Sequence, residues 1–239
     1  MDNRAAWEAE AQSWLRWARS PGHDAYWQYR DAFFRIVPAP GRHTLEVACG
    51  EGRVTRDLIA RGHTVTALDG SPTLVQHAAE ADQHGHYCIG DAAGTPFQAG
   101  SFDVAVAYNC LMDFDDMPAS VNEIARVLLP GGTFCICVPH PLVDSGGFES
   151  EQVDSPFRLT EPYLETRAFD GIEERDGLSM HFTGWSHTLE EYVSVLVNAG
   201  FVIDALREPT PASKTGRYER WHRYPMFLNL RAIKREIDG

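Results

Sequence analysis

Two glycines and two aspartates follow short apolar segments of the sequence, where their types and spacing suit the binding of a nucleotide. Residues 44–48 form an apolar segment that leads into a turn holding Gly50 and Gly52, and a helix is expected directly after it. Glycines let the backbone turn sharply and approach a ligand closely, and the first N–H groups of a helix are free to bind an anionic group. A glycine turn after a strand also occurs as plain scaffold, so this signal needs support from elsewhere in the chain.

Two carboxylates after the next apolar segments give that support. Asp69 follows the segment 64–68, where a carboxylate can accept both hydroxyls of a ribose. Asp91 follows the segment 87–89 and can accept from an adenine amino group. Either aspartate could instead be a simple turn former. Taken with the glycine turn, they favour a nucleoside-binding site.

Dinucleotides and S-adenosylmethionine compete for such a site. The dinucleotide pattern requires a third glycine for close helix packing, and Thr55 occupies that position here. Glu46, just before the turn, suits the ammonium group of a methionine moiety. The sequence therefore favours S-adenosylmethionine over NAD.

Three residues are candidates for handling a proton during methyl transfer. His140 directly follows the expected fifth strand, at the edge where ligands of such sheets bind, and an imidazole suits proton removal near neutral pH. His187 precedes an expected helix, and Asp113 could orient an amine or a histidine. The alternatives are a loop-fixing role for His140, a solvent-facing His187, and a solvated acidic turn around Asp113. His84 and His86 resemble a metal pair without a third ligand, so no metal site is predicted.

Alternating strands and helices are expected to position these residues. Strands are predicted at residues 44–48, 64–68, 87–89, 103–107 and 133–138, with helices between them. This alternation indicates an α/β fold whose parallel sheet has helices on both faces. Two further strands, 201–206 and 225–233, are expected as a hairpin at one sheet edge. A helix that starts with a capping box at 188–191 precedes them.

Two segments lie outside this alternation. Residues 1–40 are rich in aromatic side chains and indicate helices, whereas 140–187 carry little periodicity. We expect a single domain over 1–239 in which 1–40 and 140–187 form a cap over an organic substrate. Aromatic side chains of the first segment could then supply apolar walls or cation–π faces; ordinary packing of the helix on the sheet is the alternative.

Composition limits the class of protein. The net charge is −13, which argues against nucleic acid as a partner, because such sites concentrate Lys and Arg. No apolar run is long enough for a membrane span, and the N-terminus lacks the pattern of a secretory signal. The five cysteines indicate buried thiols in the reducing cytoplasm.

The segments above resemble the motifs of class I S-adenosylmethionine-dependent methyltransferases. The resemblance covers roughly residues 40–138 and rests on 46–52, Asp69, 90–92, 96–97, 101–103 and 126–132. Ala48 departs from it, since the family usually has glycine there. Residues 111–118, 139–141 and 207–209 are similar to an actinobacterial-type subgroup.

The resemblance implies a Rossmann-like sheet of seven strands with an antiparallel last strand, and S-adenosylmethionine as cofactor. It assigns Asp69 to the ribose and Asp91, with Ala92, to the adenine. The residues implied around the rest of the cofactor are Glu46, Ala48, Gly50, Gly70, Ser71, Asn109, Cys110 and Leu111.

Transfer of a methyl group to an oxygen or nitrogen of a small molecule is the function predicted first. The alternatives are a protein or peptide methyltransferase, and a binding module or oxidoreductase on the same fold.

Overall fold

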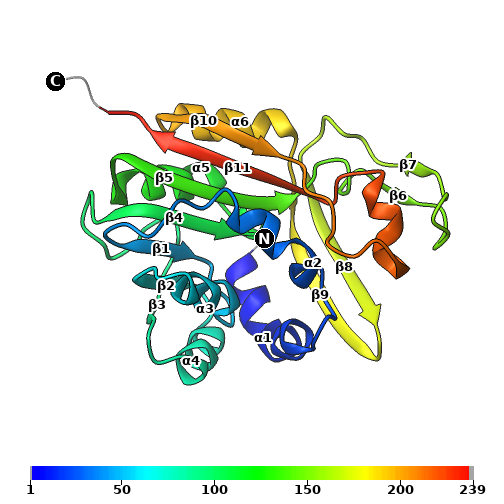
Figure 1. Cartoon of the computed structure of the whole chain (residues 1–239), viewed down its shortest axis with the longest axis horizontal. Coiled ribbons are helices and arrows are strands. Elements are labelled where there is room, and N and C mark those ends of the chain that lie inside the picture. Colours follow the sequence, from blue (N-terminus) through cyan, green and yellow to red (C-terminus); the bar gives the residue numbers. More distant parts are fainter. Residues whose placement is uncertain (1, 237–239) are drawn as a thin grey trace.

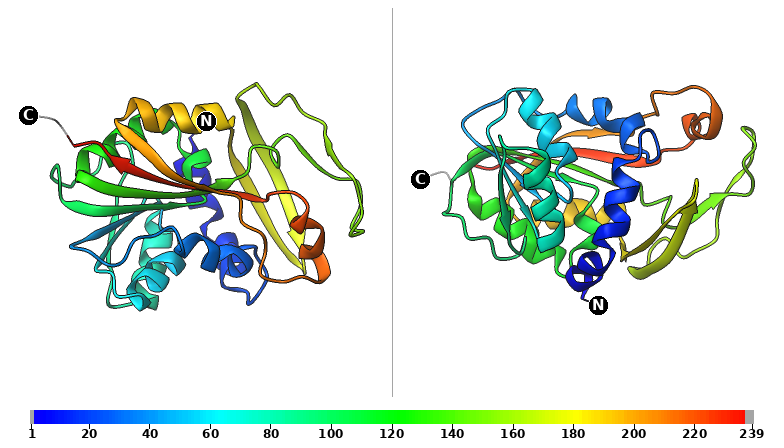
Figure 2. Two further views of the ribbon diagram at one scale, coloured as in Figure 1. Left: turned by 45° about the horizontal axis from the view of Figure 1, so that its top comes forward. Right: turned by 90° about the horizontal axis from the view of Figure 1, so that it is seen from below.

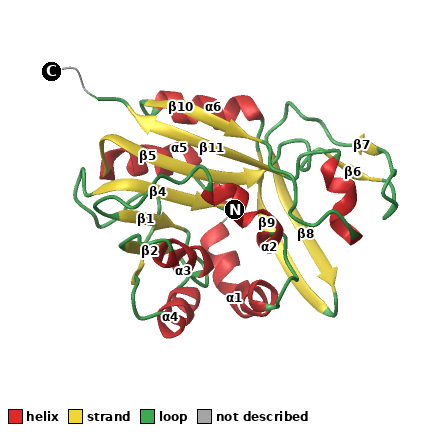
Figure 3. Ribbon diagram, in the orientation of Figure 1, coloured by secondary structure: helices red, strands yellow, loops and turns green. Residues whose placement is uncertain are grey.

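The computed structural model describes residues 2–236, so Met1 and residues 237–239 of the predicted single domain lie outside the described part. Its main sheet contains seven strands: β1 Thr44–Val47, β2 Val65–Asp69, β3 His86–Ile89, β4 Phe102–Tyr108, β5 Leu128–Pro139, β10 Phe201–Arg207 and β11 Phe227–Lys234. Their order is β10-β11-β5-β4-β1-β2-β3 (Figures 1 and 3). The first five strands pair in parallel, and β11 is antiparallel to both β5 and β10. The predicted seven-stranded, mostly parallel sheet is thereby confirmed.

The two faces of the sheet are buried under different helices. Alternate residues of a strand point to opposite faces, and in β5 Phe134, Ile136 and Val138 join one core cluster whereas Cys135 and Cys137 join the other. Helices α5 (Met117–Val127) and α6 (Leu189–Asn198) complete the first cluster. Helices α2 (Tyr26–Phe34) and α3 (Arg53–Ala60) complete the second. Cys135 and Cys137 share one face, and all five cysteines are free.

Two more helices pack against each other, and one of them contacts β2 and β3. Helix α4 (Pro72–Ala81) is capped by Ser71, whose hydroxyl accepts from the Leu74 N–H at 3.1 Å. Helix α1 (Asn3–Arg19) packs on α4 through Ala11, Leu15 and Leu74. Within residues 2–236, no helix is long and apolar enough to cross a membrane.

The segment 140–187 contains two antiparallel hairpins, although its sequence shows little periodicity. They are β6 Gly146–Phe148 with β7 Phe157–Leu159, and β8 Arg167–Arg175 with β9 Leu178–Ser186. Asp176 and Gly177 form the tight turn of the second hairpin, with φ values of 50° and 78°. An Asp-Gly pair is a strong hairpin signal, but β8 is mostly exposed and lacks an apolar face. Its strand pattern is therefore weak in the sequence.

Hairpin β8–β9 stands beyond the carboxyl ends of the parallel strands and lies beside α1 (Figure 2). Strand β1 has β2 on one side and β4 on the other, so the chain reverses direction across the sheet at this point. Ligands of open α/β sheets bind in the crevice that such a reversal creates. The crevice is here enclosed by α1 and β9.

Candidate functional site

A cavity of about 680 Å³ occupies the crevice at the carboxyl ends of the parallel strands. Its lining includes ten of the eleven residues predicted to bind the cofactor: Glu46, Ala48, Gly50, Asp69, Gly70, Ser71, Asp91, Ala92, Asn109 and Cys110. Leu111 is the exception. It is 1% exposed and packs in the core with Met117 and Val121, because the short 3-10 helix Leu111–Asp113 turns its side chain inward.

The glycine turn between β1 and α3 has a left-handed backbone at three positions. The φ values are 52° at Ala48, 54° at Gly50 and 83° at Gly52. Gly52 is the N-cap of α3 and makes no side-chain cap, so the N–H groups of this helix end are available to a ligand. Ala48 carries a Cβ in a conformation that costs an L-residue about 1–2 kcal/mol. The turn therefore holds strain where the related family usually has glycine.

Asp69 is fixed between two loops by backbone donors. Its Oδ2 accepts from the Gly50 N–H at 2.7 Å, and its Oδ1 accepts from the Ser71 N–H at 2.8 Å. Burial raises the pKa of this carboxyl group and the two N–H donors lower it. Each oxygen keeps acceptor capacity, and the residue lines the cavity. A pair of ribose hydroxyls fits a carboxylate held in this way.

Asp91 forms a local turn and also lines the cavity. Its Oδ1 accepts from the Ala93 N–H at 2.8 Å, which forms a local turn, and its side chain still lines the cavity next to Ala92. A turn former and an acceptor for an adenine amino group are thus compatible at this position.

Glu46 and Asn109 flank the middle of the cavity. Glu46 is 2% exposed and accepts from the Thr55 hydroxyl. Burial, and to a smaller extent the charge of Asp69, raises the pKa of Glu46 to about 8. Asn109 follows β4 with φ at 57°, and its Oδ1 has no partner. Strained backbone and unpaired polar atoms often occur at ligand sites.

Helix α1 is bound to the loop after β2. Arg4 Nε donates to the carbonyl oxygen of Gly70 at 3.0 Å, and the carboxylate of Glu8 accepts from the hydroxyl groups of Ser71 and Thr73. These contacts hold α1 so that its Trp14 lies next to the glycine turn. A Cβ on Gly50 would lie 3.2 Å from Trp14 Nε1.

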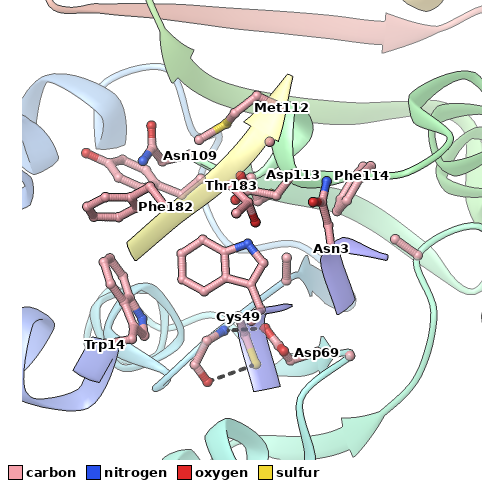
Figure 4. A pocket seen from close by; sticks show the side chains of 18 of the residues that line it. Asn3, Trp14, Cys49, Asp69, Asn109, Met112, Asp113, Phe114, Phe182 and Thr183 are labelled. Atoms are coloured by element: carbon pink, nitrogen blue, oxygen red, sulfur yellow. Dashed lines mark hydrogen bonds between the residues drawn. The ribbon is translucent and has the colours of Figure 1, made fainter. Parts of the chain in front are cut away.

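Aromatic rings from α1 and β9 form one wall of the cavity. The ring of Trp7 packs edge-on against Trp14 at 5.6 Å, and both rings contact Phe182, at 6.3 and 6.4 Å. Figure 4 shows Trp14 and Phe182 on one side of the cavity, and Asn3, Asp113 and Phe114 on the other. The sequence interpretation did not include Phe182 or Thr183, and the Asp176-Gly177 turn is the signal that could have located them.

The three candidate proton acceptors lie in different surroundings. Asp113 lines the cavity. His140 is 7% exposed and does not line it; its Nδ1 accepts from the Leu142 N–H at 3.2 Å and its Nε2 lies 3.1 Å from Glu208 Oε1. His187 also lies outside the lining, against the ring of Tyr192 at 5.5 Å. The geometry therefore favours Asp113, while His140 holds a loop together.

Burial shifts the pKa of each of these groups. It lowers the pKa of His140, against the charge of Glu208, and that of His187, against the charge of Glu191. It raises the pKa of Asp113 well above its usual value, and the negative charge of Asp69 adds to the increase. A carboxyl group with a raised pKa is a better proton acceptor than an exposed one. No group of three or more metal-binding side chains occurs among residues 2–236.

Known proteins resemble this chain over its cofactor-binding half. Residues 45–136 match the family described as "Methyltransferase domain". The nocamycin O-methyltransferase of Saccharothrix syringae is 37% identical over 114 residues, which are 44% of this chain and 41% of that enzyme. The chain thus spans less than half the length of this curated relative.

Solved structures resemble the chain over most of its length. A S-adenosylmethionine-dependent methyltransferase from Mesorhizobium loti has a TM-score of 0.69 at 24% identity, covering 88% of this chain and 98% of its own. The [4+2]-cyclase SpnF has a TM-score of 0.64 at 17% identity, covering 98% and 97%. These likenesses establish the fold.

The residues around the cavity fit S-adenosylmethionine. Asp69 provides a fixed acceptor, the α3 N-terminus is open, and Asn109 has an unpaired oxygen beside the strand ends. The family match includes the glycine turn and Asp69. Residues 45–136 thus match a methyltransferase family, and the chain as a whole has the fold of the solved S-adenosylmethionine-dependent methyltransferases.

Proposed function

We propose that the protein transfers a methyl group from S-adenosylmethionine to an oxygen or nitrogen of a small organic molecule. One observation carries the proposal: a single cavity joins the nucleoside-binding loops to an aromatic wall. Its volume of about 680 Å³ lies in the range of small-molecule sites, which is roughly 300–1,000 Å³. A cavity of this size, lined by aromatic rings, suits a small acceptor.

S-adenosylmethionine supplies a methyl group on a positively charged sulfur, which is already a good leaving group. The chain's own residues then have to hold the acceptor in line with that methyl group, because alignment provides most of the rate enhancement. Asp69 would bind the ribose and Asp91 the adenine. Glu46 and Asn109 would flank the methionine end, while Trp14 excludes water from the glycine turn.

Asp113 is the residue we assign to receive the acceptor's proton. It lines the cavity and its raised pKa suits proton transfer near neutral pH. His140 and His187 stay secondary candidates, since reaching the cavity would require each ring to leave its present neighbours.

The cap function of residues 2–40 and 140–187 is part of the proposal. Helix α1 and strand β9 both line the cavity, and their rings contact each other. The five buried or partly buried thiols also support the expected cytoplasmic location.

Calorimetric titration with S-adenosylhomocysteine, with NADH as control, tests the cofactor assignment. We expect micromolar binding of S-adenosylhomocysteine alone. Binding of NADH instead would favour an oxidoreductase. Binding of S-adenosylhomocysteine without methyl transfer to any hydroxyl or amine acceptor would favour a non-catalytic module.

A further inference from the structure

Two carboxylates that line the cavity have no cation beside them. Asp113, at the end of the short 3-10 helix, and Asp144, in the loop after β5, both line the cavity. Among residues 2–236, no lysine, arginine or histidine lies within ion-pair distance of either carboxylate, and Asp144 Oδ2 is buried without any partner. Arg167 donates to the backbone carbonyl of Asp144 rather than to its carboxylate.

The arginines that line the cavity are bound elsewhere. Arg53 pairs with Asp24 at 2.6 Å, Arg175 donates to the carbonyl oxygen of His23 at 3.4 Å, and Arg4 donates to Gly70. A buried carboxylate without a counter-charge is costly. The surroundings of Asp113 and Asp144 therefore favour a positively charged ligand.

A buried amide lies in the same region and also lacks partners. Asn3 is 1% exposed, lines the cavity, and has neither its Nδ2 nor its Oδ1 hydrogen-bonded. Figure 4 shows it close to Asp113 and Phe114. Buried amides are nearly always hydrogen-bonded in folded proteins, so an unpaired one that lines a cavity is an independent sign of a polar ligand.

Resting on the proposed methyl-transfer function, we propose that the acceptor is an amine carried on an aromatic or other apolar frame. Its protonated nitrogen binds Asp113 and Asp144, with Asn3 as a further partner. Its frame lies against Trp7, Trp14 and Phe182, where a cation also gains from the ring faces. An alcohol would leave both carboxylates without a counter-charge, and a carboxylate acceptor would add a third negative charge.

The reaction at this site balances as follows. The ammonium group gives one proton to the Asp113 carboxylate, and the freed lone pair forms the new N–C bond. The C–S bond of the donor breaks at the same time, and its electron pair stays on sulfur, which gives S-adenosylhomocysteine. The methylated nitrogen carries the positive charge, and the proton on Asp113 passes to water.

Three probes with one frame and different head groups test the inference: tryptamine, its alcohol tryptophol, and indole-3-propionate. Binding of each is measured calorimetrically to the complex with S-adenosylhomocysteine, and methylation by S-adenosylmethionine is followed by mass spectrometry. We expect tryptamine to bind at least about 10-fold more tightly than the other two, which is the effect of about one unpaired charge. Equal binding of all three, preference for the alcohol or the acid, or no binding of tryptamine would overturn the inference.

Isosteric variants test which carboxylates bind the amine. Asp113→Asn and Asp144→Asn should each weaken tryptamine binding about 10-fold and leave tryptophol within about 2-fold. Asp154→Asn, an exposed position outside the cavity, makes the same charge change and should alter nothing. An equal loss of tryptamine and S-adenosylhomocysteine affinity in Asp113→Asn would assign that carboxylate to the cofactor and refute its role at the amine.

The two proposals fail in different ways. If wild-type protein does not bind S-adenosylhomocysteine, the proposed function is refuted. If it does bind and methylates tryptophol but not tryptamine, methyl transfer stands and the amine inference is wrong.

Discussion

The ring of Trp14 in α1 packs edge-on against the ring of Phe182 in β9, with their centroids 6.4 Å apart. This contact joins the N-terminal helix to the hairpin β8–β9 across the mouth of the crevice. The same Trp14 ring lies over Gly50 on its other side. A single side chain thus connects the cap to the cofactor loop.

Phe182→Ala should open this contact and weaken acceptor binding more than cofactor binding. We expect KM for an acceptor to rise about 10-fold, because the lost ring is part of the aromatic wall, while the S-adenosylhomocysteine Kd changes less. Ile172→Ala is the matched control, since Ile172 lies on the same hairpin and is 67% exposed. Equal effects of the two variants on KM would contradict the assignment of Phe182 to the acceptor pocket.

Asp69→Ala should weaken cofactor binding. The variant removes the charged acceptor and leaves the Gly50 and Ser71 N–H groups unpaired. Hydrogen bonds to charged groups contribute about 1.5–3 kcal/mol, so the S-adenosylhomocysteine Kd should rise by roughly 10- to 100-fold. Calorimetry measures this change, and an unaltered Kd would refute the ribose assignment.

Ala48→Gly should be tolerated, or should stabilise the fold slightly. The substitution removes a Cβ from a position with φ at 52°, which relieves about 1–2 kcal/mol of strain against roughly 0.5–1 kcal/mol of added chain entropy. The control is Ala79→Gly at an exposed position of helix α4, which should destabilise the folded protein by about 0.5–1 kcal/mol. Urea unfolding distinguishes the two, and equal destabilisation would show that Ala48 is unstrained in solution.

Substitutions of Asp113 and His140 should both lower turnover, but by different amounts. Asp113→Asn should lower kcat at least about 100-fold, the lower end of the contribution of a general base. His140→Gln should lower kcat by less, and should lower Tm, because His140 binds Glu208 and the Leu142 N–H. The sequence-based hypothesis that His140 is the base predicts the reverse order. Comparing the two variants with one acceptor decides between them.

Asp144 should make the protein less stable as the pH rises. Burial raises its pKa to about 7 in the folded protein, against the opposing charge of Arg167. A raised folded pKa means that the folded state binds the proton more tightly than the unfolded state does. The contribution of Asp144 to the free energy of unfolding is therefore fully present below pH 4 and is lost as the pH passes 7. Tm should therefore fall between pH 5 and pH 8 by more in the wild type than in Asp144→Asn. Identical pH profiles would contradict the burial of this carboxyl group.

The sequence was sufficient for the main sheet and for the loops that line the cavity at its edge. Strands β1, β2, β4 and β5 are mostly apolar because helices cover both of their faces. Gly50, Asp69 and Asp91 lie at or just after the ends of β1, β2 and β3. Parallel strands end at a common edge, so the order of these residues along the chain already places them together. The predicted capping box at Thr188–Glu191 is also confirmed, because it depends only on residues close together in the chain.

The acceptor half of the site depended on tertiary structure. Phe182 reaches the cavity because hairpin β8–β9 folds over the sheet, and Asn3 reaches it because α1 binds Gly70 and Ser71. These contacts join residues far apart in sequence, and no periodicity along the chain encodes them. His140 follows β5, a position that suits a catalytic base in the sequence. In the structure its ring contacts Glu208 and lies outside the cavity. The sequence alone determined where the loops after β1, β2 and β3 lie, whereas packing of α1 and hairpin β8–β9 decided which further side chains line the cavity.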